Sequence, residues 1–171
     1  MRTGMTWLIG RGLLAGAVGT VAMDAVWYRR AVAADETKSD FLTWEFKPET
    51  SGFDDAPAPA RTARAVAERL HVPLDDRYAA PANNVVHWST GVGWGVLASA
   101  LAALPFVSGR RAGAVTGVVA WAASYAVLPR LGVYRPIGEY DRTTLWKDLS
   151  AHLVFGSACG TALALLGARR R

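Results

Sequence analysis

The sequence is poor in cysteine and histidine. Its 171 residues include one cysteine, Cys159, and three histidines. A lone cysteine excludes an intrachain disulfide and any metal site built from several cysteine thiolates. Cys159 also lies inside an apolar run, where a single cysteine usually serves as a small packing residue. The cysteine content therefore says nothing about the redox compartment.

Charge is scarce over long parts of the chain and concentrated in one segment. Residues 29–84 hold 8 Lys or Arg and 10 Asp or Glu, whereas long segments on either side hold almost none. Such an uneven distribution is typical of a membrane protein with one polar insertion. We therefore expect the lipid bilayer to be the main environment of this chain.

The sequence also lacks the marks of several functional classes. Its net charge of +5 owes much to arginines that flank apolar segments, such as Arg110, Arg111 and residues 169–171. These suit anionic lipid head groups, whereas nucleic-acid binding requires basic and aromatic residues on a folded polar face. No nucleophile motif, phosphate-binding glycine loop or multi-histidine oxidase pattern is present. We expect no nucleic-acid partner and favour a non-enzymatic role.

Four apolar segments have about the length needed to cross a membrane. They cover residues 7–28, 85–107, 112–129 and 146–167, and residues 29–84 form a polar insertion between the first two. Within the insertion, residues 59–70 place small apolar residues on one helical face and charged residues on the other. The fold class we predict is all-α. The single domain, residues 1–171, is a four-helix transmembrane bundle with one polar loop that carries an amphipathic helix.

The first apolar segment has a signal peptide as its alternative interpretation. Residues 31–33, Ala-Val-Ala, resemble a small-residue cleavage site. However, Asp24, Arg29 and Arg30 separate them from the apolar stretch, and this makes the region too long and too charged for normal cleavage. We therefore expect the segment to be retained as a membrane span.

Each apolar segment contains two glycines four residues apart, on one face of a helix. Such a spacing lets two helices approach closely, which matters in lipid because helices there associate by packing. The sequence therefore predicts helix packing through four glycine pairs. The pairs are Gly12 and Gly16, Gly91 and Gly95, Gly113 and Gly117, and Gly156 and Gly160.

Two internal shifts suggest that the bundle is a duplicated two-helix unit. A shift of about 65 residues sets His87, Gly91 and Gly95 on His152, Gly156 and Gly160. A shift of about 100 residues sets Arg11, Val18 and Arg30 on Arg111, Val118 and Arg130. Each unit would have two spans, so both copies would share one orientation about an axis along the membrane normal.

Four ionisable residues form the candidate site of this sequence. Asp24 lies near the end of the first span, His87 near the start of the second, and Asp148 and His152 near the start of the last. In an up-and-down bundle these positions lie at one membrane depth. Because ionisable groups inside a span are costly, they usually face the bundle interior and pair with each other.

Three interpretations of this cluster remain open. The first is structural, with the aspartates accepting hydrogen bonds that hold the helices together. The second is a site for a proton or a divalent metal ion such as zinc, since histidine and carboxylate are normal ligands. Haem held by His87 and His152 is the third and least favoured, because histidines near glycines are a weak signal.

We therefore predict a non-enzymatic membrane component that responds to protons or to a divalent metal. A small transporter or channel subunit and a haem-binding electron carrier are the alternatives. A monomeric pore is disfavoured, because the spans beyond residue 85 carry no ionisable residue toward the Arg110 side. A homo-oligomer or a membrane-protein partner stays open.

Several segments carry a resemblance to known families. The run LPRLGVYRPIGEYDRTTLWKDLSAHLVFG, with NNVVHW and DDAPAPA before it, resembles a family of small, uncharacterised integral membrane proteins common in actinobacteria. The order of spans and loops, and mainly residues 128–156, is more remotely similar to the YagU-like inner-membrane family. Neither family offers an established reaction. The resemblance implies the bacterial cytoplasmic membrane, multiple spans, and both termini inside.

Overall fold

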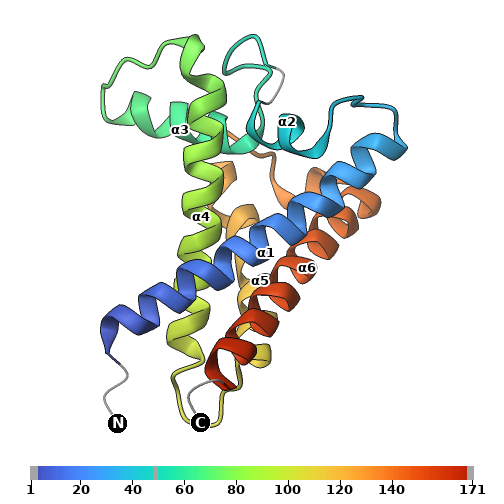
Figure 1. The fold of residues 1–171 in the computed structure, drawn as a ribbon. Helices are drawn as coiled ribbons and strands as arrows, with labels where there is room; N and C mark the ends of the chain where they lie inside the picture. Colours follow the sequence, from blue (N-terminus) through green and yellow to red (C-terminus); the bar gives the residue numbers. More distant parts are fainter. Residues whose placement is uncertain (1–3, 48–49, 169–171) are drawn as a thin grey trace.

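The computed structural model describes residues 4–47 and 50–168, and over these residues the protein is helical without strands. Four long helices form the body, and short helices cover one end (Figure 1). The long helices are α1 (Met5–Ala33), α4 (Ala79–Leu101), α5 (Gly109–Val127) and α6 (Arg142–Ala168). The short elements are α2 (Phe41–Phe46), α3 (Ala58–Arg69) and the 3-10 turns η1 (Asp76–Tyr78), η2 (Leu128–Leu131) and η3 (Ile137–Glu139).

Three of the helices in the described part of the chain are long and apolar enough to cross a membrane. They are α1, α5 extended through η2 (Gly109–Leu131), and α6 up to Gly167. The fourth long helix, α4, is not among them, although it has 23 residues. Its first turns contain Asn83, Asn84 and His87, and these polar side chains lower its mean hydropathy.

The second apolar segment begins and ends earlier than its hydropathy indicates. The sequence predicts a span over residues 85–107, whereas α4 starts at Ala79 and ends at Leu101. Pro105 cannot continue a helix, and Phe106 has a positive φ of 66° in the turn before α5. Polar residues that the prediction placed before this segment therefore form the first turns of α4.

The long helices alternate in direction, so α1 begins and α6 ends at the same end of the molecule (Figure 1). The most extensive packing joins α1 to α4, α5 to α6, and α1 to α6. By comparison α4 touches α5 and α6 little. The α4–α5 side of the body is consequently its most loosely packed seam.

The α1–α4 contact is made at glycine. A Cβ atom added to Gly16 would lie 2.7 Å from the Gly91 carbonyl oxygen, and one added to Gly12 would lie 2.6 Å from the Val96 Cα. Gly95 lies against the backbone of both Gly12 and Gly16. The two backbones therefore touch directly, without intervening side chains.

The α5–α6 contact has the same character. Gly113 lies against the backbone of Gly156 and Gly160, and a Cβ added to Gly117 would lie 2.5 Å from the His152 carbonyl oxygen. Close backbone contact at glycine thus occurs in both the α1–α4 pair and the α5–α6 pair. This arrangement is what a repeated two-helix unit would produce.

A buried arginine fastens α1 to α4 below these contacts. Arg11 Nε donates to Ser99 Oγ at 2.7 Å and Nη2 donates to the Ser99 carbonyl oxygen at 2.8 Å. Ser99 Oγ in turn donates to the Leu8 carbonyl oxygen at 2.8 Å. The oxygens of Ser99 thus satisfy the Arg11 guanidinium. The Arg11 side chain occupies the space between the two helices.

The glycine contacts predict a position-specific effect of an added methyl group. Gly95→Ala should destabilise the protein by about 1–3 kcal/mol, because the new Cβ would meet the backbone of α1. Gly93→Ala on the same helix is the control, since a Cβ there has nothing within 4 Å and alanine favours a helix over glycine. Thermal unfolding of the detergent-purified variants measures both, and equal melting temperatures would contradict the prediction.

Candidate functional site

Asp24 and His87 form a buried pair between α1 and α4. Both carboxylate oxygens of Asp24 lie 3.0 Å from His87 Nε2. Asp24 is only 3% exposed, and the imidazole is partly buried beside it. Because a carboxylate can only accept, Nε2 carries the proton in this contact. The pair satisfies a charge that would otherwise be costly to bury.

A third ionisable group, Glu45, reaches the same place from the covering helix α2. Asp40 caps this helix by accepting from the backbone N–H groups of Leu42 and Thr43. The Glu45 side chain is buried and accepts a hydrogen bond from Trp88 Nε1 at 3.0 Å. Burial, and next the charge of Asp24, raise the pKa of Glu45 above its ordinary value of 4.5.

Contacts on both sides hold α2 over the pair. Tyr28 Oη donates to the Ser39 carbonyl oxygen at 2.9 Å. On the other side, Asn84 Nδ2 donates to the Phe46 carbonyl oxygen at 2.9 Å, and the Phe46 ring stacks on Trp88 at 5.9 Å. Glu45 is therefore placed by the end of α1 and the start of α4 together.

Asp24, Glu45 and His87 have the geometry of a metal-binding group. Each offers one ligand atom, and these atoms lie within 4.8 Å of one another. Two carboxylates and an imidazole suit zinc, iron or manganese. One turn from His87 on α4, the buried amide oxygen Asn83 Oδ1 has no hydrogen-bond partner among the described residues. Asn83 lines the same cavity as the group.

Asp148 and His152 form a second pair, within α6. His152 Nδ1 lies 3.0 Å from the Asp148 carbonyl oxygen and 3.4 Å from Asp148 Oδ1. Both atoms accept, so Nδ1 carries the proton in this contact. Asp148 Oδ2 is buried without a hydrogen-bond partner among the described residues. The pair therefore retains one carboxylate oxygen that can accept a further hydrogen bond.

An aromatic cluster borders the second pair. The Tyr125 ring lies 5.3 Å from the ring of Tyr134 and 5.4 Å from that of Tyr140. In the loop before α6, burial and next the charge of Asp148 raise the pKa of Tyr134 to about 12. Tyr134 thus stays protonated at neutral pH and can act as a hydrogen-bond donor.

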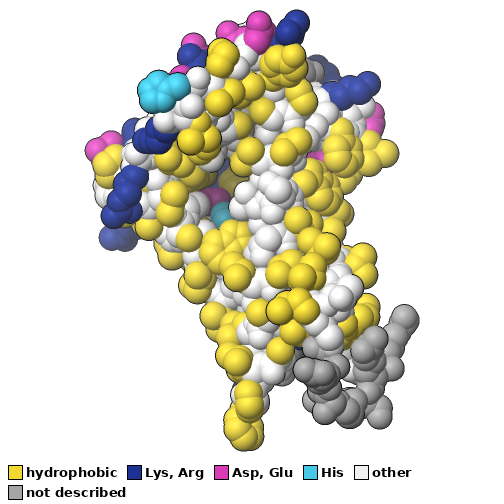
Figure 2. Space-filling model, turned by 90° about the vertical axis from the view of Figure 1, so that its left-hand side faces the viewer, with side chains coloured by type: hydrophobic (Ala, Val, Ile, Leu, Met, Phe, Trp, Pro, Cys, Tyr) yellow, Lys and Arg dark blue, Asp and Glu magenta, His cyan; other side chains and the backbone are white. Residues whose placement is uncertain are grey.

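Both acid–histidine pairs line one cavity of about 1000 Å³. It lies among the four long helices, below α2 and the start of α3, and Glu45 also lines it. Figure 2 shows a hollow in one face of the molecule, bordered by hydrophobic side chains, with an acidic side chain and a histidine inside. Polar groups thus face a space large enough for a ligand.

The structure brings the four predicted site residues to one cavity, as two pairs rather than one cluster. Among the described residues, the one group with metal-ligand spacing combines Asp24 and His87 with Glu45, not with Asp148 and His152. Sequence reasoning missed Glu45 because it lies in the polar insertion. Its local signal is weak: an acid between two aromatic residues, Trp44 and Phe46, shortly after a capping aspartate.

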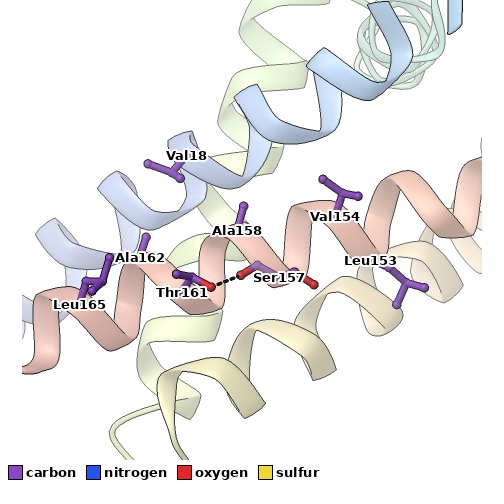
Figure 3. Close-up of a pocket in the computed structure, with 8 residues that line it drawn as sticks. All are labelled: Val18, Leu153, Val154, Ser157, Ala158, Thr161, Ala162 and Leu165. Carbon is purple, nitrogen blue, oxygen red and sulfur yellow. Dashed lines mark hydrogen bonds between the residues drawn. The ribbon is translucent and has the colours of Figure 1, made fainter. Parts of the chain in front are cut away.

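A second hollow lies outside the bundle and has a different character. The residues that line it, labelled in Figure 3, come from α1 and α6 and are mainly apolar. Its Thr161 hydroxyl donates to the Ser157 carbonyl oxygen within α6, at 2.8 Å. None of its described lining residues is ionisable. These residues offer no group for acid–base or metal chemistry.

Comparison with known proteins adds no assignment, because no protein-family model, curated protein or solved structure matches the chain.

The raised pKa of Glu45 predicts that this residue lowers the stability of the metal-free protein at neutral pH. Because the pKa of Glu45 is raised in the folded protein, its contribution to stability is fully present below pH 4.5. That contribution is lost as the pH rises through the folded-state pKa. In EDTA-treated protein, Glu45→Gln should therefore be at least as stable as the wild type at pH 7.5, since glutamine still accepts from Trp88. Its advantage should shrink as the pH falls toward 4.5.

Thermal unfolding at several pH values measures this difference. The exposed Glu68, paired with Arg64 on α3, is the control, because its substitution relieves no burial and should give no gain at pH 7.5. A Glu45→Gln variant that is clearly less stable than wild type at pH 7.5 without metal would overturn the prediction.

Proposed function

We propose that the protein is a four-span component of the bacterial cytoplasmic membrane that binds a divalent transition-metal ion through Asp24, Glu45 and His87. The observation that carries the proposal is the position of three ligand atoms within 4.8 Å of one another, on three different elements. The role is binding and response rather than catalysis. The Asp24–His87 pair also holds α1 and α4 together.

The length and packing of α4 support its role as the fourth span. Its 23 residues correspond to about 35 Å of helix, enough for the hydrocarbon core. It lies along α1 through backbone contacts at Gly91 and Gly95. Its polar residues Asn83 and His87 line the cavity, where water and partners can satisfy them.

The donor set supports a transition metal more than magnesium or calcium. An imidazole nitrogen favours zinc, iron or manganese, while the hard cations prefer ligands that are all oxygen. Binding would replace the Asp24–His87 hydrogen bond by metal bonds and release protons. The bound charge would also relieve the repulsion between Asp24 and Glu45, which lie close together.

The closed lower half of the bundle supports a binding role over a pore. Below the cavity, α1 and α4 touch at glycine, and Arg11 with Ser99 occupies the space between them. Phe155 fills the α1–α6 contact at Gly19, where an added Cβ would lie 2.8 Å from its ring. The packed helices therefore block the passage of an ion from the cavity to the end of the bundle where α1 begins and α6 ends.

Metal loading tests the proposal directly. After EDTA treatment and incubation with zinc or manganese, the detergent-purified wild type should retain one equivalent by elemental analysis. His87→Ala and Glu45→Gln should each weaken binding at least tenfold in calorimetric titration, because each removes one of three ligands. His152→Ala is the matched control, since its imidazole lies outside the group, and it should bind like the wild type.

Two results would overturn the metal assignment. One is stoichiometric metal that persists in both ligand variants while their size-exclusion profiles stay native. The other is a folded wild type that takes up neither metal at micromolar concentration. Visible absorption on the same samples separates the haem alternative, because a Soret band lost in both His87→Ala and His152→Ala would assign the cavity to haem instead.

A further inference from the structure

The cavity opens sideways between α4 and α5. Thr90 on α4 and Val127 on α5 both line it, and both are exposed, Val127 by 51%. Residues that face a cavity and the outside at once mark an opening: Lys47 and Lys147 mark one at the upper end, and Thr90 and Val127 mark a lateral mouth. The mouth coincides with the loosely packed seam between these two helices. With α4 and α5 as membrane spans, it would face the lipid.

The lining of the cavity changes from charged to apolar along the helices. The cavity follows α4 from Asn83 to Trp94, which corresponds to about 17 Å along the helix axis. At the deep end the lining includes Trp94, Ala120 and Phe155, and at the upper end it includes Arg30 and Lys147. This order matches an amphiphile whose head lies at the upper end and whose chain lies deeper.

The charges at the upper end favour an anionic head group. We use the term rim cations for Arg30, Lys47 and Lys147, which line the cavity and have no carboxylate partner among residues 4–47 and 50–168. Arg30 donates instead to the Lys147 carbonyl oxygen at 2.7 Å and to Ser150 Oγ at 2.8 Å.

The acids that line the cavity are mostly engaged. Asp24 is paired with His87, Asp148 is paired with His152, and Glu45 accepts from a tryptophan N–H. Glu36 and Glu45 line the cavity without an ion-pair partner in the described part of the chain. Three rim cations against these two acids leave an excess of unpaired positive charge at the upper end.

We infer that the cavity holds one bilayer phospholipid with an anionic head group, which enters between α4 and α5 and places its phosphate among the rim cations. The inference rests on the proposed membrane placement but not on the metal. A cavity of about 1000 Å³ accommodates the head group and the first part of a chain, and the rest of the lipid extends through the mouth into the bilayer.

Native mass spectrometry of the EDTA-treated, detergent-purified protein tests the inference. The probes are phosphatidylglycerol and phosphatidylcholine with identical acyl chains, so only the head group differs. We expect one phosphatidylglycerol per chain and at least tenfold weaker binding of phosphatidylcholine. Lys147→Gln should reduce this preference at least threefold, because it removes one rim cation and leaves the carbonyl that Arg30 contacts. Inorganic phosphate at millimolar concentration should not displace the lipid, because it lacks the chain.

Neighbouring alanines on α5 give a matched pair of variants for the mouth. Ala123 lines the cavity and Ala122 is exposed outside it. Ala123→Phe should weaken phosphatidylglycerol binding at least tenfold by filling the mouth, while Ala122→Phe should stay within twofold of wild type. Val86→Phe and Val85→Phe repeat the comparison on α4, since Val86 lines the cavity and Val85 is 68% exposed.

Three outcomes would overturn the inference. They are equal affinity for the two lipids, equal loss in the lining and exposed variants, and displacement of the lipid by inorganic phosphate. Alkaline carbonate extraction of membranes that contain the chain tests the membrane placement separately. Elemental analysis of zinc-loaded Ala123→Phe tests the metal site separately, so the failure of one idea can be distinguished from failure of another.

Discussion

Direct backbone contact at glycine is the constraint on which the rest of this structure depends. Gly16 meets Gly91 between α1 and α4, and Gly117 meets Gly156 between α5 and α6. Above these points the facing side chains are larger, with Asp24 on α1 and His87 on α4. Helices that touch at glycine on one side must separate where such side chains stand between them. The cavity is therefore a consequence of where the glycines stop.

The two helix pairs are built alike and yet differ at their polar end. A shift of 101 residues relates Gly12 and Gly16 to Gly113 and Gly117, and the same shift sets Tyr125 on Asp24. On the partner helices, the 65-residue shift relates His87 to His152 and Asn83 to Asp148. Both pairs thus combine a histidine with a carboxylate, but the carboxylate comes from opposite helices of the pair.

This exchange explains why the halves offer different chemistry. In the first half the carboxylate of Asp24 comes from the facing helix, so it leaves room for Glu45 to approach the same imidazole from α2. In the second half Asp148 lies one turn from His152 on the same helix and holds its Nδ1 from within. Tyr125, Tyr134 and Tyr140 occupy the neighbouring space. A group with metal-ligand spacing forms where the charges converge, and an acid–histidine pair within one helix forms where they do not.

Local patterns predicted what depends on local geometry. The spacing of Asp148 and His152 fixes their contact within one helix, and the hydropathy of α1, α5 and α6 identifies three helices of membrane-spanning length. Both ends of α4 were predicted six residues too late. A hydropathy pattern does not show that a helix can begin with a polar turn when that turn faces a cavity. The sequence could not predict that Glu45 joins the site. Its helix is held in place by hydrogen bonds from Tyr28 to Ser39 and from Asn84 to Phe46, and these join residues that are far apart in the sequence.

The origin of Glu45 gives the proposed metal a structural role as well. Asp24 and His87 belong to long helices held by backbone contacts, whereas Glu45 belongs to a six-residue helix. So short a helix is not stable by itself and relies on its cap and its contacts with α1 and α4. An ion shared by all three ligands would join this covering helix to the bundle, and its loss would leave two carboxylates in mutual repulsion. Metal binding would therefore hold α2 in place over the cavity, and metal loss would release it. The space below α2 is where we place the lipid head group.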